Sequence, residues 1–131
     1  MIGLDTNVLV RYLTHDDPAQ YAKAAAFIEA ATTKGEHFVV NTAVLCELAW
    51  VLASVYNYSR VEIGDALERI FATAQFEIER LDEARQALSD FRSTKADFSD
   101  ALIGRVNRAL GAEHTATFDR GLKGIDTFRV L

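Results

Sequence analysis

Five acidic residues occupy places in this sequence where carboxylates could act together. Asp5 follows the apolar run MIGL, and Asp119 follows HTATF. Glu47 lies alone in the apolar segment TAVLCELAWVLASVY, and Asp97 and Asp100 are three residues apart. Hard divalent cations such as Mg²⁺ take oxygen ligands, usually a few carboxylates with several waters. Such a site can orient a phosphodiester, activate water and stabilise the leaving oxygen. Together, the acids predict a metal-binding cluster.

Two of these acids also have a local structural explanation as caps. Asp is a favoured N-cap residue, so Asp5 could cap the helix that follows it. Asp119 could cap a short turn in the same way, and Thr117 could place a hydroxyl beside it. The capping role and the metal role both remain open for these residues.

Asp97 and Asp100 lie in the segment DFSDALIGRVNRAL, which has a helical pattern. Two carboxylates in a first turn favour the helix dipole, which is the structural explanation. They also repel each other at this spacing, and a shared cation would remove that cost. The flanking small residues Ala101 and Gly104 would leave room for a substrate backbone.

Glu47 lies in a predicted helix with apolar residues all round it, so we expect most sides of this helix to be buried. No Lys or Arg lies within four residues of Glu47. An isolated buried charge is very expensive, so its carboxylate should be paired, hydrogen-bonded, neutral or bound to metal. A long-range salt bridge or an exposed helix edge is the alternative.

The elements that would position these acids alternate along the chain. We predict strands at residues 1–4, 37–40, 76–78, 114–117 and 128–130. We predict helices at residues 6–13, 18–31, 42–56, 59–73, 81–91 and 97–110, the fourth opened by a capping box. This alternation, without hairpin signals, indicates an α/β structure with a mainly parallel sheet. Ligands bind beyond the carboxyl ends of such strands, where we expect Asp5 and Asp119.

Composition limits the class of protein. A chain of 131 residues, 50% hydrophobic and 25% charged, is expected to form a single ordered domain. Cys46 is the only Cys, which excludes an internal disulfide and a C-x-x-C site, and we expect it to be a buried structural thiol. The net charge of −5 argues against coating nucleic acid by bulk electrostatics, although a local basic rim remains compatible with it.

Neither export nor membrane insertion is expected. The first residues lack a basic region followed by a long apolar one, so a cytoplasmic protein is the default. Residues 38–59 carry one charge, Glu47, and a membrane span would place it near the bilayer centre at a cost of about 2.5–3.5 kcal/mol. A buried strand followed by a buried helix is the better interpretation.

Four acid-bearing segments, LDTNVLVRYL, VLCELAWVL, ADFSDALIG and TFDRGL, follow one another along the whole chain. With these segments the sequence resembles the PIN-domain family, in particular the VapC-type toxins of bacterial and archaeal toxin–antitoxin pairs. The resemblance implies one PIN-like domain over residues 1–131 and a three-layer α/β/α sandwich with a mainly parallel central sheet. It also implies a homodimer and a VapB-type antitoxin that occupies or blocks the site.

The resemblance further implies that the acids hold Mg²⁺ or Mn²⁺ for the hydrolysis of RNA. The catalytic and metal-binding residues that it implies are Asp5, Glu47, Asp100 and Asp119. The auxiliary residues are Asp97, Thr6, Asn7 and Thr117. In these roles Thr6 and Asn7 would position Asp5 or a metal-bound water, and Thr117 would support Asp119.

Basic side chains near the acid-bearing segments are candidates for contacts with RNA phosphates. They are Arg11, Lys95, Arg105, Arg108, Arg120 and Lys123. The histidines show no helical HExxH spacing, so a zinc site is not expected.

Two other classes of function compete with a nuclease. One is a PIN-like binding module without turnover. The other is a phosphoacceptor receiver domain, which would need paired acids after its first strand, whereas Asp5 is followed by Thr6.

Overall fold

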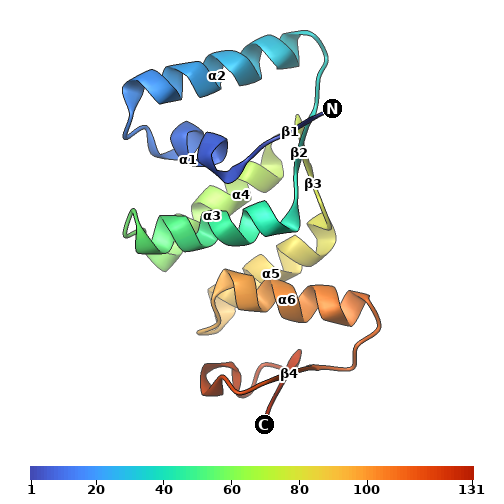
Figure 1. The fold of residues 1–131 in the computed structure, drawn as a ribbon. Helices are drawn as coiled ribbons and strands as arrows, with labels where there is room; N and C mark the ends of the chain where they lie inside the picture. Colours follow the sequence, from blue (N-terminus) through green and yellow to red (C-terminus); the bar gives the residue numbers. More distant parts are fainter.

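The computed structural model describes residues 1–131, in which short strands alternate with helices (Figure 1). The strands are β1 (Ile2–Gly3), β2 (Phe38–Val40), β3 (Phe76–Ile78), β4 (Thr115–Thr117) and β5 (Phe128–Val130). The helices are α1 (Thr6–Thr14), α2 (Pro18–Thr33), α3 (Thr42–Ser54), α4 (Arg60–Ala72), α5 (Leu81–Ser93) and α6 (Phe98–Ala109), and η1 (Arg120–Leu122) is a short 3₁₀ turn. The predicted elements are all present, with ends that agree within two residues.

Helix starts follow the local signals in the sequence. Asn41 caps α3, since its side chain accepts a hydrogen bond from the backbone N–H of Val44 at 2.9 Å. The predicted capping box at α4 is formed in both directions between Ser59 and Glu62. Such caps satisfy backbone donors that have no partner inside the helix, which helps to fix where α3 and α4 begin.

Every strand pair is parallel, which confirms the predicted α/β class and agrees with a three-layer α/β/α arrangement. The strands nevertheless form two sheets, one in the order β1-β2-β3 and one of β4 with β5. We expected a single sheet to carry Asp5 and Asp119 at one edge, and this expectation is wrong. β1 has only two residues, and the N–H groups of Ile2 and Leu4 both donate to the segment around β2.

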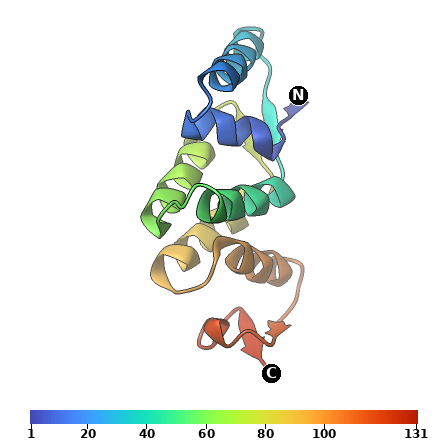
Figure 2. The same cartoon turned by 60° about the vertical axis from the view of Figure 1, so that its left-hand side comes forward.

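The two sheets lie in different parts of the molecule. α1 and α2 lie at one end, with β1 to β3 along their side, and the β4–β5 pair lies at the other end (Figures 1 and 2). α6 contacts β4, so the C-terminal strands pack on that helix. The element that carries Asp119 is therefore placed by α6 and not by β1.

Gly104 of α6 lies directly against the segment that leads into β5. A Cβ at this position would lie 2.7 Å from Oγ1 of Thr127 and 2.8 Å from the ring of Phe128. The space beside Gly104 is thus filled by the segment leading into β5. Our expectation that this glycine leaves room for a substrate backbone is wrong.

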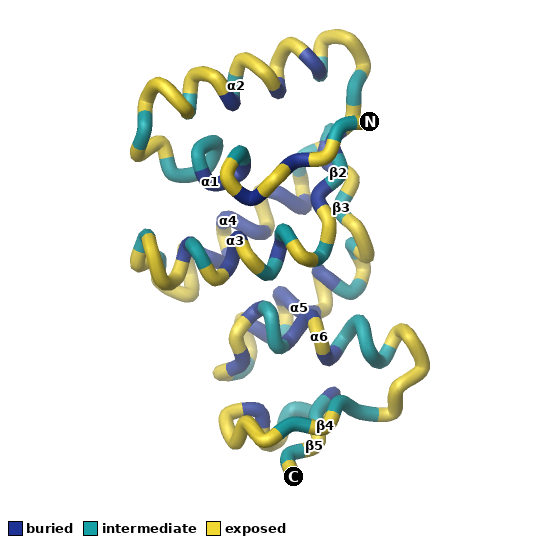
Figure 3. The backbone as a smooth tube through the Cα atoms, viewed as in Figure 1, coloured by how far each residue is buried: buried dark blue, intermediate teal, exposed yellow.

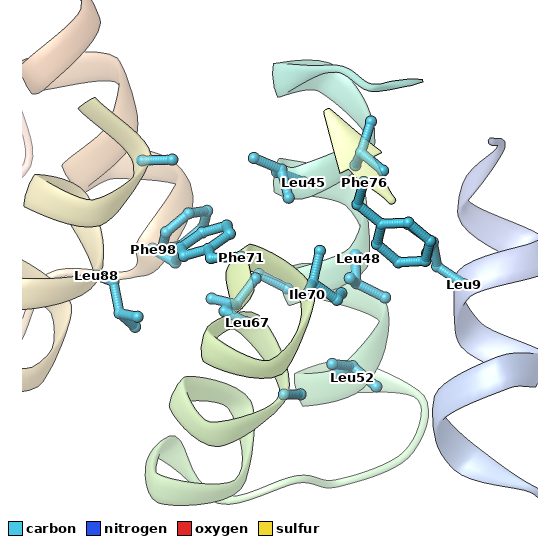
Figure 4. Close-up of a cluster of buried hydrophobic side chains, with 14 of the residues drawn as sticks. Leu9, Leu45, Leu48, Leu52, Leu67, Ile70, Phe71, Phe76, Leu88 and Phe98 are labelled. Atoms are coloured by element: carbon cyan, nitrogen blue, oxygen red, sulfur yellow. The ribbon is translucent and has the colours of Figure 1, made fainter. Parts of the chain in front are cut away.

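The hydrophobic core lies between the helices, and α3 contacts α1, α4 and α6 (Figures 3 and 4). Leu45, Leu48 and Leu52 of α3 are fully buried, with Leu67 of α4 beside them. Full burial of each such side chain stabilises the fold by about 1.5–3 kcal/mol. Cys46 is half-buried, less than the buried position that we expected, and this burial raises the pKa of its thiol. No helix has both the length and the apolar composition of a membrane span.

Candidate active site

Two acids, Asp97 and Asp100, lie where α6 begins, and the negative charge of a third, Asp119, acts on Asp100. Asp97 is the N-cap residue of α6, but its side chain makes no capping hydrogen bond and is 83% exposed. Asp100 lies in the first turn of the helix and is half-buried. The pKa of Asp100 is raised, first by burial and then by the negative charges of Asp97 and Asp119. Both neighbouring charges therefore disfavour the ionised form of Asp100.

Asp119 is held at the end of β4 by short local hydrogen bonds. Its Oδ1 accepts from the N–H of Gly121 at 2.8 Å, and its own N–H donates to Oγ1 of Thr117 at 3.0 Å. Asp119 thus caps the short turn η1, which is the capping role considered for it from the sequence. Thr117 contacts the backbone of Asp119. A cap uses one carboxylate oxygen, so the other oxygen of Asp119 makes no hydrogen bond within the protein.

Asp5 lies after β1, at the start of α1. It is the N-cap residue, and its Oδ1 accepts from the N–H of Thr6 at 2.8 Å. The hydroxyl of Thr6 is buried and has no hydrogen-bond partner, so Thr6 contacts Asp5 through its backbone only. Asn7 is exposed, and its side chain makes no hydrogen bond to Asp5.

Glu47 is exposed on α3, so the prediction that this carboxylate is buried is wrong. The buried stripe of α3 runs through Leu45, Leu48 and Leu52. At 100° per residue, Glu47 lies about 160° from Leu45 and about 100° from Leu48. Apolar residues on the other sides of α3, such as Trp50, are exposed and do not cover it.

The acids of the protein do not form a complete metal site by themselves. No three side chains of Asp, Glu, His or Cys lie close enough together to hold one ion. Neither Asp5 nor Glu47 is among the charges that raise the pKa of Asp100. Mg²⁺, however, is usually bound by one or two carboxylates together with water and substrate phosphate. Asp100, with Asp97 or Asp119, offers oxygen donors of this kind where a cation would relieve repulsion.

A cavity of about 180 Å³ opens beside Asp97 and Asp100. Its remaining lining comes largely from apolar side chains of α3 to α6: Ala49, Trp50, Ala53, Ile63, Phe91, Phe98 and Ser99. Trp50 is 64% exposed at this cavity. It lies on the side of α3 opposite the buried leucines.

The basic candidates fall into two groups. Three form ion pairs with acids of the same chain: Arg11 with Asp16 at 2.9 Å, Arg105 with Asp90 at 2.7 Å, and Arg108 with Asp126 at 3.3 Å. Three are exposed and make no ion pair: Lys95, Arg120 and Lys123. The second group is available to bind phosphate, and Arg120 and Lys123 flank the turn that follows Asp119.

Comparison with known proteins adds to this geometry. The sequence profile of the PIN domain family matches residues 2–127. The chain is also similar to the VapC ribonuclease of Aquifex aeolicus (strain VF5), with 27% identity over 120 residues that cover 92% of this chain and 88% of that protein. No solved structure matches the chain.

Proposed function

We propose that this chain, which belongs to the PIN domain family, is a metal-dependent endoribonuclease of the VapC type. The observation that carries the proposal is the placement of Asp97 and Asp100 beside a cavity, with the charge of Asp119 acting on Asp100, in a chain with this family membership. Its similarity to a VapC ribonuclease supports RNA as the substrate.

The side chains have separate roles in this proposal. When bound, Mg²⁺ or Mn²⁺ would neutralise phosphate charge and increase the acidity of water. Asp100 would hold the ion, with Asp97 or Asp119 beside it. Asp5 and Glu47 are the further ligands that the family resemblance implies. The exposed cations Lys95, Arg120 and Lys123 would contact RNA phosphates and position the strand.

Ionisation of Asp100 links the site to pH. Its pKa is raised, so protonation competes with the cation at a higher pH than for an ordinary Asp. Cation binding, and with it hydrolysis, is therefore expected to strengthen as the pH rises through this raised pKa.

The test is RNA cleavage by the purified protein with Mg²⁺ or Mn²⁺, compared with Asp100→Asn and Asp5→Asn. Each variant should lose about 100-fold or more in kcat/KM, the loss found when an electrostatic contact to the transition state is removed. Glu29→Gln on α2 is the matched control, because Glu29 is an exposed acid without an ion pair. Equal cleavage by native protein and Asp100→Asn would reject the proposed site.

Partners and compartment are part of the same proposal. We expect a homodimer, a VapB-type antitoxin that blocks the acid site, and action in the cytoplasm, where RNA is available. Light scattering of the purified chain tests the dimer. Co-expression with the product of the neighbouring reading frame tests the antitoxin, which should form a complex and suppress cleavage.

A second candidate is a PIN-like binding module without turnover. The observation that favours it is that no three acids come together as a metal cluster. Saturable Mn²⁺ binding in the absence of any RNA cleavage would support this candidate over the nuclease.

A further inference from the structure

Arg60, the first residue of α4, reaches the connection between α5 and α6. Its Nη2 lies 2.6 Å from the carbonyl oxygen of Phe91, 2.8 Å from that of Ala96 and 3.2 Å from that of Thr94. Its Nη1 lies 4.0 Å from Oδ1 of Asp97. One guanidinium therefore touches the end of α5, the connection and the acid that opens α6.

The stack on Phe91 fixes the plane of this guanidinium. Cζ of Arg60 lies 4.0 Å from the centroid of the Phe91 ring, a cation–π contact. The carbonyl of Phe91 belongs to the last turn of α5, where a cation is favourable because the helix dipole is negative. Arg60 is thus held by Phe91 from two directions.

The connection also has constraints of its own, because Ala96 within it is buried and Arg105 of α6 pairs with Asp90 of α5 at 2.7 Å. α5 ends at Ser93 and α6 begins at Phe98, so the four residues between them belong to neither helix. Oγ1 of Thr94 donates to the carbonyl of Asp90 at 2.7 Å and accepts from the N–H of Ala96 at 3.1 Å. Arg60 supplies the contact that ties this turn to a third element, α4. The start of α4 and this turn lie on the same side of the molecule (Figure 2).

We propose that Arg60 is a positioning residue for the acid pair Asp97 and Asp100. It sets the direction in which α6 starts, and so the place of both carboxylates, and it offers a positive charge beside Asp97. This inference rests on the proposed function of the same acids. Asp97 and Arg60 are both largely exposed, so screening makes the direct attraction small and leaves the turn geometry as the main effect.

Arg92 provides a matched control on the same pair of helices. It extends from α5 to α4, where it pairs with Asp65 at 3.3 Å and Glu68 at 3.2 Å. Its side chain is 41% exposed, close to the 45% of Arg60, but it contacts no residue of the turn before α6. Arg92→Gln removes an α4–α5 contact, and neither Asp97 nor Asp100 takes part in that contact.

The experiment compares native protein, Arg60→Gln, Arg60→Lys and Arg92→Gln. Mn²⁺ affinity is measured by calorimetry without RNA, at a temperature where circular dichroism shows all four to be folded. Hydrogen exchange is followed at the Ala101 amide, which donates the first helical bond of α6 to the carbonyl of Asp97 at 3.0 Å. These two measurements separate the position of the acids from general stability.

Arg60→Gln should weaken Mn²⁺ binding about 10-fold, the loss typical of a residue that orients a ligand, and should accelerate exchange at Ala101. Arg60→Lys should recover only a minor part of the affinity, because its ammonium keeps the positive charge but not the planar fork that stacks on Phe91 and reaches the carbonyls. Arg92→Gln should leave both measurements at their native values.

Three results would overturn the inference: unchanged exchange at Ala101 in Arg60→Gln, equal Mn²⁺ affinity in Arg60→Gln and Arg92→Gln, or no Mn²⁺ binding by native protein. Failure of the proposed function is a different outcome, namely native protein that does not cleave RNA. Native protein that binds Mn²⁺ in an Arg60-dependent way without cleaving RNA would refute the function and retain the inference.

Discussion

Replacing Gly104 by Ala should destabilise the protein, whereas the same change at Gly64 should stabilise it. Both glycines are buried inside helices, Gly64 in α4 and Gly104 in α6. Ala is favoured over Gly in a helix interior by about 1 kcal/mol, so the helical gain is the same at the two sites. The difference must come from what each new methyl group meets.

At Gly104 the methyl group would lie 2.7 Å from Oγ1 and 3.0 Å from Cβ of Thr127. Thr127 is 1% exposed and cannot move aside, so overpacking should cost about 1–3 kcal/mol. After the helical gain of about 1 kcal/mol, the net change is about 0–2 kcal/mol of destabilisation. Because the strained contact holds the C-terminal strands on α6, Asp119 should move away from Asp100.

At Gly64 the methyl group meets only the far end of a flexible side chain, Nε of Arg92 at 3.0 Å. The ion pairs of Arg92 with Asp65 and Glu68 are exposed and are worth about 0–1 kcal/mol, so their adjustment costs little. Gly64→Ala should therefore gain up to about 1 kcal/mol.

Urea unfolding of the two variants and the native chain measures these changes directly. The midpoints should move in opposite directions, and the thermal midpoints should differ by about 3–5 °C for each 1 kcal/mol. RNA cleavage should fall in Gly104→Ala and stay native in Gly64→Ala. If both variants gain the same stability, the described packing of β5 on α6 is wrong.

Three further predictions concern charge. The pKa of Asp100 is raised in the folded state, so its carboxylate disfavours folding above that pKa and has no effect below the unfolded value. Asp100→Asn should therefore raise the melting temperature at pH 7 but not at pH 3, and an equal rise at both would contradict the assigned cause. Arg105 binds Asp90 through two bonds of 2.7 and 2.8 Å, so Arg105→Gln should cost about 1–3 kcal/mol of stability. Exposed Arg120 has no such partner, so Arg120→Gln should keep native stability but lower the salt dependence of RNA binding by about one counterion. Urea unfolding measures the stability of both variants, and a salt titration measures their RNA affinity. A stable Arg105→Gln, or an Arg120→Gln that loses stability, would contradict these two roles.

Local structure was accessible from the sequence because its causes are local. The capping box of Ser59 and Glu62 depends on residues three apart, and strands such as Phe76–Ile78 were placed from apolar runs between breaks. The α/β class followed from the order of these elements. The four acid-bearing segments likewise indicated a family that the comparison then confirmed.

Long-range contacts were not accessible in the same way. A helical pattern shows which residues share a face, but it does not show which other element covers that face. Glu47 was therefore placed in the interior, although α3 buries one stripe only. Arg105 was assigned to phosphate because nothing in the sequence announces its pairing with Asp90, fifteen residues earlier.

The sequence by itself determined the helices and strands, the α/β class, the family and the acids worth examining. Tertiary structure alone decided that the charge of Asp119 acts on Asp100, that the space beside Gly104 is filled by Thr127, and that Arg60 reaches the turn before α6. The physical reason is range. Capping and periodicity act within a turn or two of chain, whereas charge, burial and close packing act between whichever residues folding brings together.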